Sequence, residues 1–415
     1  MYIEFGYGNS SMEVRIEKEN LLDVLLPFRD AATTDAAALI EAALDRPIGS
    51  PPLSQLVKRG QKIAVIISDV TRPCPSYKIL PPLLERLLSA GVDPRDVTIV
   101  SGLGSHRPQT ELEKQRLVGS YVFKKYAVED SCDSGYVVAG TSSRGTVYEV
   151  CRTVLEADVR IAVGNIDYHY FAGYSGGAKA LMPGVCSRRS IEQNHTMMLR
   201  QGARAGQIQG NPVRADIDEV LRFISLDFLV NVVLNDKKEI VAAVCGDAIE
   251  AHRAGCAALD ELYKCPIDRL ADIVITSVGG QPKDINVYQT QKALDNAKWA
   301  VREGGTIILV GECAEGYGEK TFAAWLEAAT CPQDLIDRIG REFRLGGHKA
   351  AAIAAVAKKH DIYLVSSLSE EQAGRLFMKP FSSLQAAYDD ALERLGPQAT
   401  VYCLPAGGST LPYLR

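Results

Sequence analysis

Short β-branched runs alternate with amphipathic stretches in the first half of the chain. Residues 62–68, 97–102 and 159–165 have the apolar composition of buried strands, and residues 77–90 carry apolar positions at helical spacing. This order of strand, helix and strand predicts a parallel sheet with helical crossovers. In such sheets, functional side chains are expected beyond the carboxyl ends of the strands.

An antiparallel addition to this first sheet is also predicted. Residues 228–234 and 239–245 are apolar runs that flank Asn235-Asp236-Lys237-Lys238, a polar segment typical of a hairpin turn. A helix is predicted over residues 247–263.

The alternating pattern restarts near residue 265, which predicts a second domain. Its expected elements are strands at 272–278, 306–311, 362–368 and 400–404 and a helix over 287–301. We therefore predict an α/β fold with two domains, 1–265 and 266–404, each a mainly parallel sheet covered by helices, with an active-site cleft between them. Residues 405–415 either close the second sheet or return to the first domain.

Composition narrows the range of partners. The chain has 415 residues and a net charge of −5, with no run of like charges, which disfavours nucleic acid and anionic membranes as partners. The apolar runs are shorter than the ~20 residues that a membrane-spanning helix needs, and no secretory signal is visible. We therefore expect a cytoplasmic protein with a small-molecule substrate. The ten cysteines form no Cys-x-x-Cys pair, so we expect reduced thiols that pack as core residues and no structural zinc.

Three of the six histidines, His106, His169 and His195, lie in glycine-rich or cap-like settings. Histidine can act as an acid, a base or a metal ligand near neutral pH. Taken singly, each is equally well explained as a hydrogen-bonded loop histidine. Residues 102–108 lack the third glycine of a dinucleotide-binding loop, so that cofactor class is disfavoured.

Residues 68–73 follow a predicted strand and supply Asp69, Val70, Thr71 and Arg72. A guanidinium such as that of Arg72 can bind a carboxylate through two parallel hydrogen bonds. The alternative is a helix N-terminus in which these polar side chains serve as caps. Both interpretations can hold together.

Residues 167–184 are the most informative stretch. Gly176-Gly177 precedes a predicted helix and can present backbone N–H groups to an anion, and Lys179 follows in the first turn. Desolvation or a neighbouring cation would free the Lys179 amine for covalent attachment; otherwise it is a surface lysine at a helix start. His195 alone is a sparse metal site, but it suffices if a cofactor supplies the other ligands to nickel.

In the second domain, Gln289 and Lys292 share one face of a predicted helix that begins near Tyr288. They could present an amide and a cation to a substrate carboxylate. The alternative is a pair of solvated polar residues in a first helical turn.

Together these segments resemble the nickel-dependent lactate racemase family, and the match covers both predicted domains. The motifs that carry it are Asp69-x-Thr71-Arg72-Pro73, His106-Arg107-Pro108, His169 to Lys179 with Pro183-Gly184, Asn194-His195 and Tyr288-Gln289-x-x-Lys292. The resemblance implies a racemase or epimerase of a small 2-hydroxy acid. The chain departs from the family pattern at Ser68, Gly145-Thr146-Val147 and Tyr168. These departures leave open which hydroxy acid is the substrate.

The resemblance also implies a cofactor, the nickel-pincer nucleotide Ni(II)-pyridinium-3,5-bisthiocarboxylic acid mononucleotide. Lys179 would hold it covalently, His195 would ligate the nickel, and Asp69, Val70, Thr71 and Arg72 would line the nucleotide, so the first domain would be the cofactor-binding, catalytic one. His106 and His169 would be the catalytic bases. In the second domain, Tyr288, Gln289 and Lys292 would bind the substrate together with Arg72 from the first. Proteins that make the cofactor are possible further partners.

Two other functions compete with this one. A pyridoxal phosphate enzyme would use Lys179 as the Schiff base and Ser175-Gly176-Gly177 as a phosphate cradle. A non-catalytic cofactor-binding protein would use the same residues without turnover.

Overall fold

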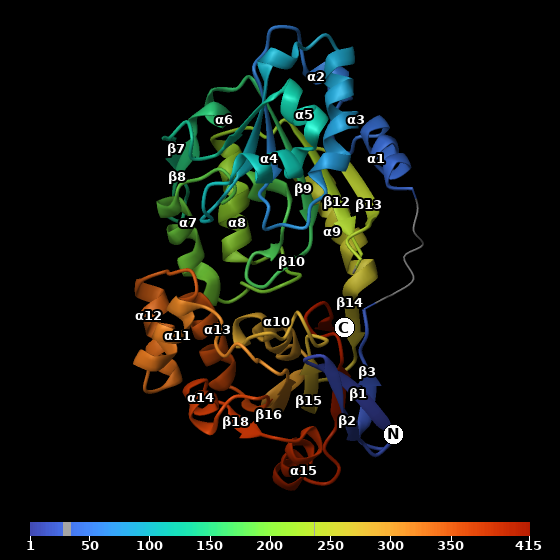
Figure 1. Cartoon of the computed structure of the whole chain (residues 1–415), viewed down its shortest axis with the longest axis vertical. Coiled ribbons are helices and arrows are strands. Elements are labelled where there is room, and N and C mark those ends of the chain that lie inside the picture. Colours follow the sequence, from blue (N-terminus) through green and yellow to red (C-terminus); the bar gives the residue numbers. More distant parts are fainter. Residues whose placement is uncertain (28–34, 236) are drawn as a thin grey trace. The chain divides into compact units, whose positions relative to one another are not determined.

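The computed structural model describes residues 1–27, 35–235 and 237–415. The chain divides into two units, a central unit of Asp30–Glu261 and a terminal unit of Met1–Arg29 with Leu262–Arg415 (Figure 1). The division at the carboxyl side lies close to the expected residue 265. Residues 1–29 had been expected in the first domain, and the structure groups them with the second half of the chain.

The central unit contains a six-stranded sheet of order β13-β12-β9-β4-β5-β6. Its strands are β4 (Ile63–Ser68), β5 (Val97–Gly102), β6 (Ala127–Asp130), β9 (Val159–Ile166), β12 (Phe228–Leu234) and β13 (Ile240–Gly246). All neighbours are parallel except β12 and β13, which run antiparallel. The predicted strands and the antiparallel addition are therefore confirmed, whereas residue 236 of the predicted turn lies outside the described residues.

Helices cover this sheet because their apolar faces match its buried strands. On α3 (Ser76–Ser89), four leucines, at positions 80, 83, 84 and 87, pack in one core cluster with Ile63, Val65 and Ile67 of β4. The other helices of the unit are α1 (Ala36–Asp45), α2 (Leu53–Leu56), α4 (Glu111–Val118), α5 (Ser120–Lys125), α6 (Arg152–Glu156), α7 (Arg188–His195), α8 (Pro212–Glu219) and α9 (Glu250–Tyr263). Two hairpins complete it, β7 (Tyr136–Thr141) with β8 (Val147–Cys151) and β10 (Tyr168–His169) with β11 (Gly173–Tyr174).

The terminal unit has a second six-stranded sheet, of order β18-β17-β16-β15-β19-β3, with parallel neighbours throughout. Its strands are β15 (Ala271–Ser277), β16 (Val301–Val310), β17 (Asp361–Val365), β18 (Lys379–Phe381), β19 (Val401–Leu404) and β3 (Leu21–Val24). Its helices are α10 (Val287–Ala297), α11 (Lys320–Ala328), α12 (Pro332–Arg341), α13 (Gly347–Ala357), α14 (Glu370–Arg375) and α15 (Leu384–Leu395). The predicted α/β fold with mainly parallel sheets is confirmed in both units.

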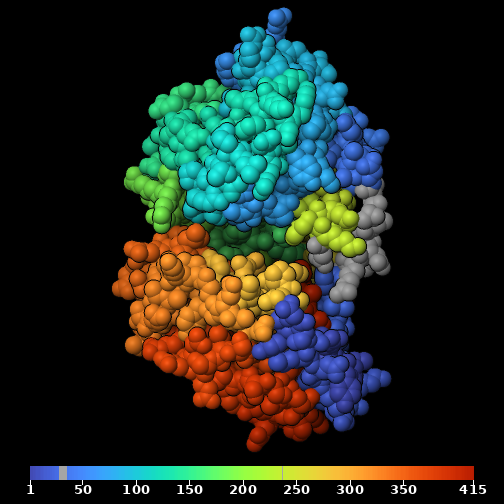
Figure 2. Space-filling view, viewed as in Figure 1, coloured from blue at the N-terminus to red at the C-terminus, as the bar shows by residue number. Residues whose placement is uncertain are grey.

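Strand pairing explains why both chain ends belong to the terminal unit. β3 extends the sheet beside β19, and the hairpin of β1 (Tyr2–Tyr7) and β2 (Ser10–Arg15) contributes Phe5 and Val14 to the core of this unit. Figure 2 shows these first residues in blue against the red carboxyl-terminal part. At the other end, β20 (Leu411–Leu414) pairs with β14 (Lys264–Ile267), so residues 405–415 stay with the second half rather than returning to the first.

Two further expectations concern composition. Eight of the ten cysteines are buried as free thiols, in agreement with their expected place in the core, while Cys132 is half-buried and Cys331 exposed. Within the described residues, no helix combines the length and the apolarity needed to cross a bilayer.

Candidate active site

Two of the predicted site residues meet at the carboxyl edge of the central sheet. Asp69 follows β4 and His106 follows β5, and these neighbouring strands are paired up to Ser68 and Gly102. Because both loops leave the same edge, the side chains converge, and Nδ1 of His106 lies 2.6 Å from a carboxylate oxygen of Asp69.

Asp69 is held as an anion. Its carboxylate also accepts hydrogen bonds from the hydroxyl of Thr71, at 2.7 Å, and from the backbone N–H of Thr71, at 3.2 Å. Burial raises the pKa of Asp69, but the hydrogen bonds from His106 and Thr71 and the charges of His106 and Arg72 outweigh burial and lower it overall. The carboxylate therefore accepts a hydrogen bond from Nδ1–H of His106. In the neutral ring the lone pair then lies on Nε2.

Further hydrogen bonds, which the sequence did not indicate, hold the loop that carries Asp69 in place. The side-chain oxygen of Gln109 accepts the backbone N–H of Val70 at 2.9 Å. Gln109 in turn donates its backbone N–H and its side-chain amide to the buried Asp130, both at 2.8 Å. Gln109 follows His106 by three residues, and this proximity was the only available indication of its role.

His169 lies on the β10–β11 hairpin in a setting opposite to that of His106. Its Nδ1 accepts the backbone N–H of Ala172 at 3.2 Å, so the neutral ring carries its proton on Nε2. Its ring meets Phe171 edge-on, with centroids 4.5 Å apart. Burial lowers the pKa of His169 well below its usual value, and nearby cationic groups lower it further.

Lys179 and His195 lie within electrostatic reach of this same imidazole. After burial, the groups that lower the pKa of His169 are Lys179, Arg72 and His195, in that order. Phe171 also contacts His195 edge-on, with centroids 4.8 Å apart. The four predicted residues Arg72, His169, Lys179 and His195 are therefore grouped around one region of the central unit.

The Lys179 side chain is in a state suited to covalent chemistry. Burial lowers the pKa of its amine well below the usual 10.5, and the positive charges of Arg214 and Arg72 lower it further. Since only the neutral amine is nucleophilic, this environment favours attachment of an acyl or thioacyl group.

The glycines before Lys179 differ from their expected role. They lead into a short 3-10 helix, Gly177–Ala180, rather than an α-helix, and the N–H of Gly177 donates to the side-chain oxygen of Asn231 at 2.9 Å. Ser175 donates its hydroxyl to the carbonyl of Asn165 at 2.8 Å. Because these groups bond within the protein, the predicted anion cradle at Ser175-Gly176-Gly177 is not supported.

His195, at the end of α7, is oriented as a metal ligand would be. Asn194 donates its amide to Asp216 at 2.7 Å, which leaves its oxygen to accept Nδ1–H of His195 at 2.9 Å. The neutral ring then bears its lone pair on Nε2, the nitrogen that a metal would use. Within the described part of the chain, no group of three or more His, Cys, Asp or Glu could hold a metal ion.

Sequence reasoning also missed a buried cation behind this segment. Arg214 on α8 is fully buried. It donates to the carbonyls of Ala172, at 3.2 Å, and of Tyr174, and pairs with Asp218 at 3.3 Å. It therefore fixes the backbone that joins His169 to Lys179. A Glu or Asp four residues from an Arg is common on exposed helices, so the burial of Arg214 could not be predicted from this spacing.

A buried histidine supports the same segment from α9. Nε2 of His252 bonds to the carbonyl of Ser175 at 2.8 Å, and Arg253 donates to its Nδ1 at 2.7 Å. Arg253 also pairs with Asp218 at 2.5 Å. This network links α8 and α9 to the glycine-rich loop.

The remaining predicted residues lie in the terminal unit. The side chain of Asn286 caps α10 by accepting the backbone N–H of Gln289 at 3.1 Å. Tyr288 is half-buried against Phe322, with ring centroids 5.7 Å apart, and Lys292 is exposed one turn further along. The helix on which Gln289 and Lys292 were predicted is therefore present, and their binding of substrate stays a prediction.

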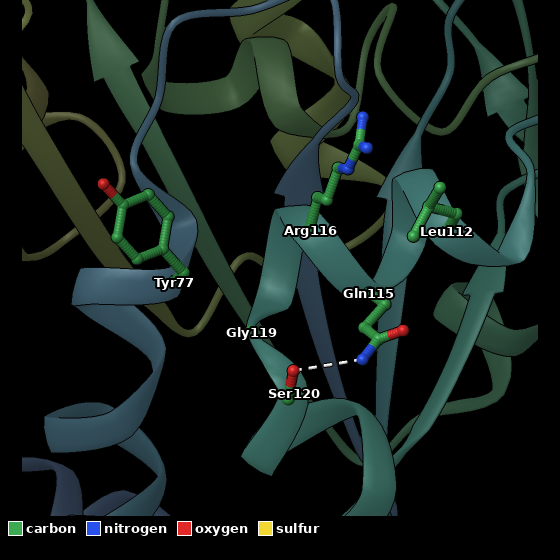
Figure 3. A pocket seen from close by; sticks show the side chains of 6 residues that line it. All are labelled: Tyr77, Leu112, Gln115, Arg116, Gly119 and Ser120. Carbon is green, nitrogen blue, oxygen red and sulfur yellow. Dashed lines mark hydrogen bonds between the residues drawn. The ribbon is translucent and has the colours of Figure 1, made fainter.

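A separate pocket on the central unit does not coincide with these residues (Figure 3). A hydrogen bond of 3.0 Å from Gln115 to Ser120 crosses its edge. It is lined by Tyr77, Leu112, Gln115, Arg116, Gly119 and Ser120. None of the predicted site residues is among them.

Comparison with known proteins identifies the family. Residues 7–206 match the lactate racemase N-terminal domain, and residues 268–411 match the lactate racemase C-terminal domain. The chain is 31% identical to the lactate racemase of Thermoanaerobacterium thermosaccharolyticum, over 99% of this chain and 98% of that protein. The chain belongs to the lactate racemase family. It is 33% identical to the family member from Lactiplantibacillus plantarum, over 98% of both chains, and is accordingly an isomerase of the racemase class.

Solved structures agree with this family assignment. The lactate racemase apoprotein from T. thermosaccharolyticum matches with a TM-score of 0.87 at 31% identity, over 99% of this chain and 100% of that one. A Thermotoga maritima protein matches with a TM-score of 0.62 at 17% identity, over 92% of this chain and 100% of that one, and shares the fold.

Proposed function

We propose that this racemase inverts the hydroxyl-bearing carbon of a small, lactate-like 2-hydroxy acid. The observation that carries the proposal is a pair of histidines in opposite tautomers: His106 bonds to Asp69, and His169 lies with the low-pKa amine of Lys179 and the imidazole of His195. The charge of Arg72 acts on both groups, because it lowers the pKa of Asp69 and of His169. A racemase needs proton-transfer groups for two mirror-image substrates, and a pair of imidazoles supplies them near neutral pH.

The residues of the chain fit the nickel-pincer nucleotide. Lys179 would hold it covalently, His195 would ligate the nickel through Nε2, and Asp69, Val70, Thr71 and Arg72 would line the nucleotide. When bound, it would supply a reversible hydride acceptor for the substrate carbon.

The histidines would handle the hydroxyl proton. Nε2 of His106 is the lone-pair nitrogen and would take the proton, and Asp69 would stabilise the imidazolium that forms. His169 would donate a hydrogen bond from Nε2–H to the same oxygen. For the other enantiomer His169 must become the acceptor at Nε2, which requires its proton to move to Nδ1 and the contact with Ala172 to open.

Binding would depend on charge complementarity. Arg72 of the central unit and Gln289 and Lys292 of the terminal unit would anchor the substrate carboxylate, with Tyr288 beside them. Holding the carboxylate fixed keeps the reacting carbon in register while the planar keto acid is exposed on either face.

The deciding experiment is intact-mass analysis with nickel quantification, after expression beside a cofactor-producing system. We expect a mass increase located on Lys179 and one nickel per chain. Active, nickel-loaded protein with unmodified Lys179 would refute the attachment. A borohydride-trapped Schiff base without nickel would instead indicate a pyridoxal phosphate enzyme, and cofactor without turnover would indicate a binding protein.

The base assignment has its own test. His106→Ala and His169→Ala should each abolish racemisation while the cofactor is retained. Full activity in either variant would remove that histidine from the mechanism.

A further inference from the structure

Lys349 on α13 is a buried lysine to which the proposed reaction gives no role. Only 7% of its surface is exposed. Its ammonium nitrogen lies 4.0 Å from the ring centroid of Tyr288 and donates to the carbonyl of the same residue. Both contacts are to uncharged groups.

This cation has no counter-ion in the part of the chain that the structure describes: no carboxylate oxygen lies within 4.0 Å of its nitrogen. Burial, and then the charge of Lys292, lowers the pKa of Lys349 to about 7, although Asp295 opposes the shift. Asp295 is itself paired with Lys298 at 2.5 Å. A buried ammonium without a counter-ion is costly, and such groups are concentrated at functional sites.

Lys349 adjoins the helix face to which we assign substrate binding. Tyr288 and Lys292 are four residues apart on α10 and so share that face. The ring of Tyr288 contacts Lys349, and the charge of Lys292 helps to lower the pKa of Lys349. Its neighbour His348 adds no positive charge, because burial and Lys349 lower the pKa of His348 to about 3. Lys349 therefore adds a second positive charge beside a face on which Lys292 is already assigned to the carboxylate of a lactate-like substrate.

We infer that Lys349 forms a subsite for a second carboxylate, beside the one that Lys292 anchors, so that the preferred substrate is a 2-hydroxy dicarboxylic acid such as malate. This inference rests on the proposed function, because it takes the α10 face as the substrate-binding face. A second carboxylate would supply the missing counter-ion of Lys349, and the Tyr288 ring would position the ammonium beside it.

A protection experiment tests the subsite on protein without cofactor. The protein is treated with limiting acetic anhydride near neutral pH, and acetylation of Lys349 is followed by peptide mass analysis. We expect malate at about ten times its Kd to slow this acetylation about tenfold, because only the unliganded fraction reacts, and lactate at the same concentration to slow it much less. The exposed Lys358, at the end of the same helix, is the internal control and should react equally in all samples.

Turnover gives an independent test in the cofactor-loaded enzyme. In Lys349→Met, kcat/KM for malate should fall about tenfold more than kcat/KM for lactate, as the loss of one such interaction predicts. Lys349→Arg should recover part of that difference, because it retains the cation. Lys358→Met removes a charge from the same helix and is the matched control, with the malate-to-lactate ratio of the parent enzyme.

The outcomes separate this inference from the proposed function. If the enzyme racemises lactate but malate neither reacts nor protects Lys349, the second-carboxylate subsite is refuted and the proposed function stands. Equal losses for both substrates in Lys349→Met would also refute it. If no hydroxy acid is racemised but malate protects Lys349, the proposed function fails and the anion subsite stands. Should Lys349→Met fail to fold, the protection experiment on the parent protein still decides.

Discussion

Replacing Asp69 by asparagine tests the acid–base assignment most directly. The side chain keeps its shape and its oxygen, so Nδ1–H of His106 retains an acceptor, but the negative charge is lost. In the parent protein the carboxylate bonds to this nitrogen at 2.6 Å and to the Thr71 hydroxyl at 2.7 Å. The variant therefore removes charge from the partner of the proposed base with little change in packing.

The expected loss follows from the strength of that bond. A hydrogen bond to a charged group contributes about 1.5–3 kcal/mol, and the imidazolium that forms as His106 accepts a proton depends on it. At 1.36 kcal/mol for each factor of ten, this corresponds to a loss in kcat of about 10- to 150-fold. KM should change little, because the carboxylate anchors assigned above are untouched.

The assay is chiral chromatography of the hydroxy acid, with rates normalised to nickel content because Asp69 is also expected to line the cofactor. Asp45→Asn removes an exposed carboxylate from the same unit and should leave the rate unchanged. An Asp69→Asn rate within twofold of the parent at equal nickel content would show that Asp69 does not assist the base.

Three further predictions concern stability and metal binding. The pKa of Asp69 is lowered in the folded protein. Its carboxylate therefore stabilises the fold above its unfolded pKa of about 3.9, and this stabilisation is lost as the pH falls through the folded pKa. In urea unfolding, the free energy of unfolding that Asp69→Asn loses relative to the parent should become smaller from pH 7 to pH 3. Asn194→Ala frees Nδ1 of the adjoining imidazole and should weaken nickel retention about 10- to 100-fold on chelator challenge, as lost support of a metal ligand does. Gly173→Ala, at a φ of 80° with the added Cβ overlapping the Gln207 carbonyl, should lose about 2–5 kcal/mol of unfolding free energy. Gly145→Ala, at a φ of 87° with no atom within 4 Å, isolates the backbone cost and should lose about 1–2 kcal/mol.

Sequence periodicity found the strands because they are buried on both faces. β12 occupies the predicted residues 228–234, and its seven side chains are all buried, which produces a continuous apolar run. Periodicity is a local property and does not give pairing partners. The placement of residues 1–29 was therefore wrong, because β3 pairs with β19, nearly the whole chain away.

The same distinction applies to the site. Asp69 and His106 could be predicted from polar loops that follow neighbouring parallel strands, and their contact follows from that topology. Arg214 and His252 could not, since both occupy polar positions of amphipathic helices and only the packing shows that these positions face inward. The backbone bonds that occupy the Ser175-Gly176-Gly177 segment were hidden for the same reason, because Asn231 comes from a distant strand.

The opposite tautomers of the two histidines bear on how one asymmetric protein serves two mirror-image substrates. His106 presents Nδ1 to a carboxylate and His169 presents Nδ1 to a backbone N–H, so the outward nitrogens carry a lone pair in one ring and a proton in the other. Under the proposed function, one enantiomer meets an acceptor that is already set, while the other requires the Ala172 contact to open first. Because both directions pass through the same transition states, that rearrangement would make the two enzyme-bound enantiomers unequal in energy rather than slow one direction alone. Equilibrium between enantiomers must still be even, so the asymmetry has to appear as unequal kcat values balanced by unequal KM values.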